Sequence, residues 1–336
     1  VINDYRVHEK VGEGSFGAVF KVVHVHSGKV SAMKVITKPR RRGHKRDLLE
    51  RNLMREVAVM KFLRHPNVVT LREFIDDPRS HKVYMIQEFM AEGGLLEEAY
   101  EVDPIPEQAA FPRFIQAARG LQFIHSFGVC HGDVKPSNIL QDADGRVSLG
   151  PHRARVILKV LLWRTSLPPA RQTTTRSSRA SSRCGPAQVK IGDFGACVIL
   201  NPDDEGGDGD ISSTEPSEES HRRKHCRKKR EQRVGGTPSF HAPELFGEGG
   251  VSRISFASDL WALGITLYQM VVGRLPFFGR SYTALMAAIT MEGLSFPSNC
   301  QLEPHLVNLL HRMLDKNPKT RITLEETLHH EWVTKE

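Results

Sequence analysis

The first part of the chain alternates between apolar and polar positions. Residues 5–11, 18–25 and 30–36 each follow this period of two, and glycine-containing turns separate them. Because successive side chains of a strand point to opposite faces, such alternation gives every strand one apolar face. The pattern therefore predicts an antiparallel sheet at the start of the chain.

A helical spacing follows the third of these strands. Leu49, Leu53, Val57 and Met60 recur at steps of four and three. This spacing places the four side chains on one face of a helix over residues 47–63, and the apolar face is expected to pack on the sheet.

Longer helical stretches dominate the rest of the chain, notably residues 107–127 and 256–273, after a further strand pair that ends at Met90. We therefore predict an α+β fold with two lobes. The N-lobe, about residues 1–90, is small, antiparallel and β-rich, and the C-lobe, about residues 91–336, is larger and mainly helical.

The composition is that of a soluble globular protein, with 39% hydrophobic and 26% charged residues. The longest apolar stretch, residues 260–272, is too short for a membrane span and contains a glutamine. The N-terminus has no signal-peptide pattern. We therefore expect a cytoplasmic protein with no membrane partner. Because the chain begins at Val1 rather than at a methionine, we also expect regulatory segments outside it.

The cysteines show neither CxxC nor Cys/His ligand spacing. They are Cys130, Cys184, Cys197, Cys226 and Cys300. An odd number without such spacing predicts free thiols rather than a disulfide framework or a zinc site.

The net charge of +8 arises in one segment. Residues 147–188 contain seven arginines, one lysine and no acidic residue, which leaves 39 basic and 39 acidic residues in the rest of the chain. A second unusual segment, residues 201–233, passes from an acidic, glycine-rich half to a basic half with almost no apolar residue. We expect this second segment to be disordered, because it has no apolar surface to bury.

A glycine motif, Gly12-x-Gly14-x-x-Gly17-x-Val19, lies between the first two predicted strands. Glycines at this spacing let backbone N–H groups approach phosphate oxygens closely. The same spacing marks dinucleotide-binding folds, but there a helix follows the last glycine. Here the chain continues as a strand, which favours a nucleotide loop within an antiparallel sheet.

Lys34 and Glu56 are candidate partners in nucleotide binding. Lys34 lies among apolar residues of the third predicted strand, and Glu56 lies on the following helix. Taken singly, the lysine would extend to solvent and the glutamate would be a solvated surface residue. After a glycine loop, however, a lysine that holds phosphates and a glutamate that fixes the lysine are the expected pair.

Three further motifs occur in order: the run His131 to Asn138 (HGDVKPSN), Asp193-Phe194-Gly195 and Ala242-Pro243-Glu244. With them the chain resembles the eukaryotic protein kinase family from Tyr5 to Trp332, so that residues 1–336 would be one protein kinase domain. A lone aspartate or asparagine would only cap a turn. Turn capping does not explain three spaced motifs that occur in this order.

The resemblance implies a set of catalytic and cofactor-binding roles. Asp133 would accept or orient the proton of a substrate hydroxyl, while Asn138 and Asp193 would hold Mg²⁺ against the phosphates of ATP. Lys135 and Thr237 match the pattern of serine/threonine kinases rather than that of tyrosine kinases. Protein substrates are therefore expected.

The resemblance also locates an adenine pocket. Gln87 would be its gatekeeper, and Glu88 and Met90 would belong to the hinge. Further residues would line the nucleotide, namely Val11, Val19, Ala32 and Leu140. Two scaffold roles are implied as well: Asp259 would brace the catalytic loop, and Arg321 would pair with Glu244.

Several stretches are similar to calcium/calmodulin-dependent protein kinase kinases and related upstream kinases. They are residues 65–78, 89–98, 133–140, 275–278, 294–297, 312–323 and 329–335. Leu95 stands where kinases that select basic substrates commonly carry a carboxylate. The family-based expectation is a substrate read by docking, such as the activation loop of an AMP-activated-type kinase. Calmodulin control would act through regions outside this chain.

Gly132 replaces the arginine that usually precedes the catalytic aspartate and receives a phosphate from the activation loop. Arg233 and Val234 occupy the stretch where that phosphate is commonly carried. Our hypothesis is that activity does not depend on activation-loop phosphorylation.

Asp133 and Asp193 are 60 positions apart, which is much more than in the family. Val147-Ser148 can be encoded by GTGAGT, a splice-donor sequence, and Gln188 by CAG, an acceptor end. Removing residues 147–188, which are 42 codons or 126 nucleotides, joins DADGR to VKIGDFG. One interpretation is an in-frame intron that has been retained. The alternative is a real basic insert that extends a hairpin beside the active site, where it would block the site or tether a partner.

Three functions remain to be compared: an active kinase, a scaffolding pseudokinase and a nucleic-acid-binding module. A scaffolding pseudokinase should lack one of Lys34, Asp133, Asn138 and Asp193, and all four are present. A translated insert at residues 147–188 would still favour a catalytically impaired scaffold. The basic runs alone make nucleic acid an unexpected partner, although HRRKHCRKKR is typical of a nuclear localisation signal and adds the nucleus to the expected locations.

Overall fold

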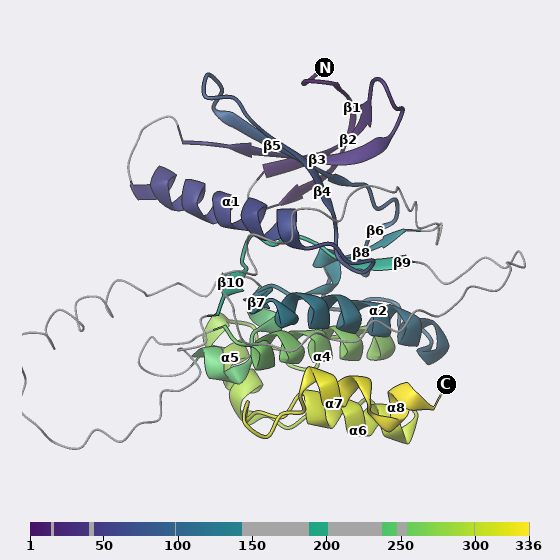
Figure 1. The fold of residues 1–336 in the computed structure, drawn as a ribbon. Coiled ribbons are helices and arrows are strands. Elements are labelled where there is room, and N and C mark those ends of the chain that lie inside the picture. The colour runs from purple at the N-terminus through teal and green to yellow at the C-terminus, as the bar shows by residue number, and fades with distance from the viewer. Residues whose placement is uncertain are drawn as a thin grey trace, which may run out of the picture.

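The computed structural model has two lobes, with the N-lobe sheet above a stack of helices (Figure 1). It describes residues 1–14, 17–39, 44–97, 99–142, 188–200, 237–246, 254–298 and 300–335. The predicted disordered segment, residues 201–233, lies outside the described residues, and so does the atypical insert apart from Gln188. The predicted α+β bilobal architecture is confirmed.

The N-lobe is built on one five-stranded antiparallel sheet with the strand order β1-β2-β3-β5-β4. Its strands are β1 (Tyr5–Gly14), β2 (Gly17–His24), β3 (Val30–Thr37), β4 (Leu71–Asp76) and β5 (Lys82–Glu88). The alternating pattern had predicted this sheet, because each strand presents one apolar face to a core.

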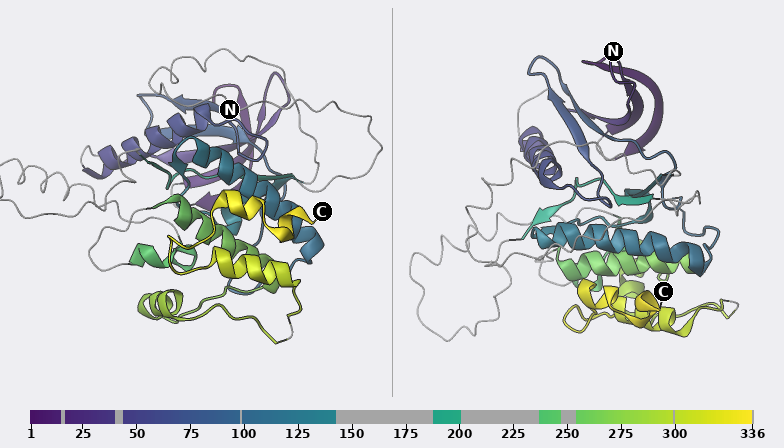
Figure 2. Two further views of the ribbon diagram at one scale, coloured as in Figure 1. Left: turned by 60° about the horizontal axis from the view of Figure 1, so that its bottom comes forward. Right: turned by 45° about the vertical axis from the view of Figure 1, so that its right-hand side comes forward.

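Helix α1 (His44–Phe62) packs along one face of this sheet (Figure 2). Leu53, Val57 and Met60 are buried there and Leu49 is partly buried, as their spacing predicted. The sheet also carries a separate small cluster of buried side chains, which are Tyr5, Val22, Met33 and Ile86.

The C-lobe is helical. Its helices are α2 (Glu107–Ser126), α4 (Phe256–Val272), α5 (Tyr282–Met291), α6 (Pro304–Met313), α7 (Leu324–Leu328) and α8 (Glu331–Thr334). Helix α4 is the central one, because every residue from Ser258 to Val271 is buried. A capping box at Ser255 begins α4 and Gly273, in the left-handed conformation, ends it. Among the described helices, none has the length and apolar character that a membrane crossing requires.

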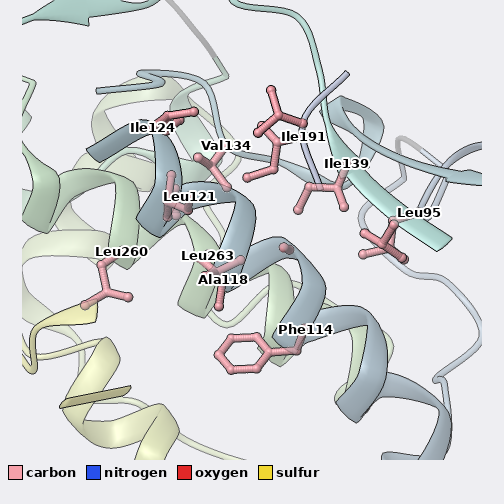
Figure 3. Packing of buried hydrophobic residues seen from close by; sticks show 14 of the residues in the cluster. Leu95, Phe114, Ala118, Leu121, Ile124, Val134, Ile139, Ile191, Leu260 and Leu263 are labelled. Carbon is pink, nitrogen blue, oxygen red and sulfur yellow. The ribbon is translucent and has the colours of Figure 1, made fainter. Parts of the chain in front are cut away.

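One hydrophobic core runs through both lobes and includes side chains from α1, α2, α4 and the strands between the lobes. Figure 3 shows Phe114 and Leu121 of α2 beside Leu263 of α4, with Ile139 and Ile191 above them. The strands that carry the loops between the lobes are therefore packed directly on the most buried helices.

Short elements between the lobes position the loops that matter for function. They are β6 (Gly93–Gly94), β7 (Val129–Cys130), η1 (Pro136–Asn138), β8 (Ile139–Asp142), β9 (Gln188–Ile191), β10 (Val198–Ile199), η4 (Pro238–Phe240) and η5 (Pro243–Phe246). Strand β8 pairs with β6 and β9, and β7 pairs with β10, all antiparallel. The loop between β7 and β8 thus lies beside the loop between β9 and β10.

No disulfide joins the cysteines within the described residues, which are Cys130, Cys197 and Cys300, and Cys184 and Cys226 lie outside those residues. Burial raises the pKa of the Cys197 thiol to about 12, so that this thiol stays protonated at neutral pH.

Gly120 provides a test of how α2 packs. A Cβ at this position would lie 2.4 Å from the carbonyl oxygen of Asn67, which accepts a hydrogen bond from Ile191 of β9. We expect Gly120→Ala to lower the free energy of unfolding by about 1–3 kcal/mol, because the backbone must move to admit a methyl group. Urea-induced unfolding measures this change.

Gly293→Ala is the matched control, because nothing lies within 4 Å of a Cβ built there. Its free energy of unfolding should stay within about 0.5 kcal/mol of the unsubstituted protein. Equal effects of the two substitutions would contradict the packing described for α2.

Candidate active site

Asp259 of α4 holds the loop that carries Asp133. Its Oδ2 accepts a hydrogen bond from the backbone N–H of His131 at 2.7 Å, and its Oδ1 accepts one from Gly132 at 2.8 Å. His125 Nε2 lies 2.9 Å from the same Oδ2. A buried carboxylate with three such partners is satisfied, and it fixes the backbone that leads to Asp133. The bracing role expected of Asp259 agrees with these contacts.

Asp193 lies in the loop after β9 and has a positive φ of 56°. This conformation is uncommon for residues other than glycine, so the surroundings must hold it. The neighbouring Gly192 is held on both sides: its N–H donates to the carbonyl oxygen of Asn138 at 2.8 Å, and its carbonyl lies 2.9 Å from His131 Nε2. These bonds join the loop of Asp133 to the loop of Asp193.

Lys34 bridges two carboxylates from different parts of the chain. Its Nζ lies 2.9 Å from Glu56 Oε1 on α1 and 2.8 Å from Asp193 Oδ1. Lys34 is 8% exposed and Glu56 is 3% exposed. The strand, the helix and the loop that the sequence assigned to one site therefore meet at this ammonium group.

The electrostatics of this bridge follow from burial and from the two carboxylates. Burial opposes the charge on Lys34, but Glu56 and Asp193 outweigh it, so that the pKa of the ammonium group is raised. Burial likewise opposes the charge on Asp193, but Lys34 outweighs it and the pKa of that carboxyl is lowered. Lys34 and Asp193 are thus both charged at neutral pH.

Asp133 is oriented by groups from two sides. Asn138 Nδ2 donates to its Oδ2 at 3.0 Å and to its carbonyl oxygen at 2.8 Å. The backbone N–H of Thr237 donates to its Oδ1 at 3.2 Å. Lys135 Nζ donates to Thr237 Oγ1 at 2.9 Å and lies 3.8 Å from Asp133 Oδ2. Asp133, Lys135, Asn138 and Thr237 therefore form one cluster.

The donor set around Asn138 and Asp193 fits Mg²⁺. Because the Asn138 amide nitrogen faces Asp133, its amide oxygen is directed elsewhere, and the Asp193 side chain is 39% exposed. No group of three His, Cys, Asp or Glu side chains suited to a metal occurs among the described residues. One carboxylate and one amide oxygen suit an ion that takes its other ligands from phosphates and water.

The glycines of the predicted nucleotide loop lie on the hairpin of β1 and β2. Gly12 pairs with Val19, and Gly14 pairs with Gly17 across the turn. Gly17 has a φ of 148°, and a Cβ there would lie within 2 Å of the Val35 carbonyl oxygen. Glycine is therefore required at this position by the approach of β3, in addition to any approach of a phosphate.

Two of the residues predicted to line an adenine pocket are neighbours on β3 and β5. Ala32 pairs with Gln87, and Gln87 Nε2 lies 3.6 Å from Met60 Sδ of α1. Met90 is buried. Three further residues differ in exposure: Val11 is exposed, whereas Val19 and Leu140 are partly buried.

Both carboxylate oxygens of Glu88 accept hydrogen bonds from other residues of the protein. Its Oε2 accepts a hydrogen bond from Lys190 Nζ of β9 at 2.9 Å, and its Oε1 accepts one from the backbone N–H of Thr70 at 2.9 Å. A contact from Glu88 to a nucleotide would therefore come from its main chain.

Sequence reasoning missed Lys190 and His125. Both act through partners more than 100 positions away, and neither belongs to a spaced motif. The expected partner of Glu244 was recognised: Arg321 binds its carboxylate with two hydrogen bonds of 2.8 and 2.9 Å. This bidentate pair fixes the segment that follows Thr237.

A family model described as the protein kinase domain matches residues 5–157 and 182–333. The chain is 30% identical over its whole length to a calcium/calmodulin-dependent protein kinase kinase of Caenorhabditis elegans and covers 53% of that protein. It is also 30% identical to the serine/threonine-protein kinase ssp1 of Schizosaccharomyces pombe, over 98% of the chain and 42% of the relative.

A third relative is the serine/threonine-protein kinase GRIK2 of Arabidopsis thaliana, which is 28% identical over 99% of the chain and 66% of its own length. The chain spans about half the length of the first two curated relatives. The predicted resemblance to serine/threonine kinases, among them a calcium/calmodulin-dependent protein kinase kinase, is confirmed at 28% to 30% identity.

Asp259→Asn tests the support of the catalytic loop. An amide nitrogen in place of Oδ1 or Oδ2 would face a backbone N–H, so one buried donor would lose its partner. We expect the free energy of unfolding to fall by about 2–4 kcal/mol. Chemical denaturation monitored by tryptophan fluorescence measures the loss.

Asp103→Asn is the control for this substitution, because Asp103 is an exposed aspartate. The control should unfold at the same denaturant concentration as the unsubstituted protein. If Asp259→Asn also unfolded at the denaturant concentration of the unsubstituted protein, the three hydrogen bonds to Asp259 would not support the loop.

Proposed function

The chain belongs to the protein kinase family, and from that premise we propose that it transfers the γ-phosphoryl group of ATP to serine or threonine hydroxyls of proteins. The observation that carries the proposal is the bridge from Lys34 to Glu56 and Asp193, beside the cluster of Asp133 and Thr237. Five separate segments of the chain, which carry Lys34, Glu56, Asp133, Asp193 and Thr237, meet there. Such an arrangement suits a reaction that depends on positioning and on charge stabilisation.

Each residue has a role that follows from its contacts. Lys34 carries a fixed positive charge for the α- and β-phosphates, because Glu56 and Asp193 hold its ammonium group. Asp133 accepts or orients the proton of the attacking hydroxyl, and Asn138 and Lys135 hold its carboxylate in place. Lys135 donates a hydrogen bond to Thr237, and the two residues match the pattern of serine/threonine kinases.

The residues that would hold Mg²⁺ are Asn138 and Asp193. When bound, this ion neutralises charge on the phosphates. The αL backbone of Asp193 and the hydrogen bonds of Gly192 keep the two ligand side chains on adjoining loops.

A catalytically impaired scaffold is the alternative function. It would fit a chain in which the nucleotide-binding residues no longer meet. Here Lys34, Asp133, Asn138 and Asp193 are all present and each makes a contact expected of an active enzyme. We therefore favour the enzyme.

For the substrate, we propose the activation loop of another kinase. One relative is named as a kinase kinase, and the chain covers about half of that protein. Leu95, at the position where a carboxylate would select basic substrates, is 5% exposed, so it offers no charge to a peptide. Recognition by docking follows, and AMP-activated-type kinases are the first substrates to test. Calmodulin is a partner only if regions outside this chain bind it.

Gly132 supports our proposal on regulation. Its φ is 77°, and a Cβ there would lie 2.7 Å from the Ala196 carbonyl oxygen, so the position suits glycine. A glycine has no cation to bind a phosphate. We therefore propose that catalysis does not require a phosphorylated activation loop.

A phosphotransfer assay tests the proposed activity. Radioactive phosphate from γ-labelled ATP should enter the activation-loop threonine of an AMP-activated-type kinase whose own catalysis has been disabled. Asp133→Asn should lower kcat about 10²–10⁴-fold, because the proton of the hydroxyl loses its acceptor. Asp103→Asn serves as the control with unchanged kcat. Absence of transfer to any protein, or transfer that Asp133→Asn leaves unchanged, would refute the proposed kinase activity.

Phosphatase treatment tests the proposed regulation. After alkaline phosphatase has removed all phosphate, as checked by intact mass, we expect kcat within about twofold of the untreated protein, because Gly132 binds no phosphate. A loss of activity that ATP preincubation restores would show that a phosphate is needed.

A further inference from the structure

Strands β8 and β9 form a regular antiparallel pair beside the two candidate magnesium ligands. The register pairs Ile139 with Ile191, and Asp142 with Gln188 at the open end. Asn138 directly precedes β8, and Asp193 follows β9 by two positions. This register therefore determines how Asn138 and Asp193 are placed relative to each other.

The connection between these paired strands is unusually long. Residues 143–187 join Asp142 to Gln188, which is 45 residues between two adjacent strand ends. Antiparallel neighbours are normally joined by two to five residues, and such short turns define the register. A long connection leaves the register to strand packing alone and adds to the entropy cost of closing the loop.

Removing residues 147–188 turns the connection into an ordinary hairpin. In the shortened sequence Arg146 would precede Val189 in the place of Gln188, and three residues, Ala143-Asp144-Gly145, would separate it from Asp142. Three-residue hairpin loops need a left-handed residue at their last position, and glycine stands there. In that register the opposite charges of Asp142 and Arg146 would form a favourable pair across the strands. Of the described residues, only Gln188 is removed, and its side-chain hydrogen bond to the Pro66 carbonyl oxygen is exposed.

The family match is interrupted inside this segment, although it includes residues 147–157 and 182–188. It covers the chain in two parts and leaves out residues 158–181, all of which lie inside residues 147–188. The whole excess of positive charge lies in the same segment.

We propose that residues 147–188 are absent from the functional protein and that they are the translation of an in-frame intron of 126 nucleotides. In the functional form a three-residue turn closes β8 and β9 and sets the register that brings Asn138 next to Asp193. The role of these two residues rests on the proposed function, whereas the absence of the segment does not.

The native transcript and protein provide the first test. Amplification of cDNA across the codons of Arg146 and Val189 should give a product 126 nucleotides shorter than the genomic one. Digestion of the native protein before aspartate should release a seven-residue peptide, Asp144-Gly145-Arg146 joined to Val189-Lys190-Ile191-Gly192. A single cDNA product of genomic length overturns the proposal.

Thermal unfolding of purified variants provides the second test, and it needs no enzymatic activity. We expect deletion of residues 147–188 to raise the unfolding midpoint of the 336-residue chain by about 5 °C, because the loop to be closed is much shorter. An equal or lower midpoint would mean that the segment contributes to the fold, and the proposal would fail.

Deletion of residues 147–189 is the matched control. It removes one further residue, the fully buried Val189, so that the register must shift or the turn must strain. This control should unfold several degrees below the 147–188 deletion. Equal midpoints for the two deletions would contradict the proposed turn. If the midpoints behave as expected but phosphotransfer is absent, only the proposed function fails.

Discussion

The buried bridge from Lys34 to Glu56 and Asp193 is the interaction on which the rest of the structure depends. It joins a strand and a helix of the N-lobe to a loop of the C-lobe, with Nζ to oxygen distances of 2.9 and 2.8 Å. Buried charges cost free energy of desolvation unless each has a partner. The bridge therefore fixes the positions of α1 and Asp193, and it does not add a large free energy of folding.

In the C-lobe, a buried carboxylate holds the loop of Asp133 through hydrogen bonds. Helix α4 is almost entirely buried, and its single carboxylate, Asp259, binds the backbone on the N-terminal side of Asp133. Gly192 then connects that loop to Asp193 through His131 and Asn138. A continuous set of hydrogen bonds thus runs from the core of the C-lobe to the ammonium group of Lys34.

The sequence predicted the parts of this arrangement that depend on local patterns. Alternation predicted the strands of the N-lobe, and the spacing of Leu53, Val57 and Met60 predicted the buried face of α1. Motif spacing identified Lys34, Glu56, Asp133, Asn138 and Asp193. The pairs of Lys190 with Glu88 and of His125 with Asp259 were not predictable, because each joins distant segments whose proximity is created by tertiary packing. The steric need for glycine at Gly17 likewise arises from the neighbouring strand.

The central claim is that Lys34 is held in place to bind the phosphates of ATP. Isothermal titration calorimetry of MgATP binding to the unsubstituted protein and to Lys34→Met tests it most directly. The account predicts measurable binding to the unsubstituted protein and affinity at least tenfold weaker in the variant, because a fixed positive charge beside the phosphates is lost. Equal affinity for the two proteins, or no binding by either, would contradict it.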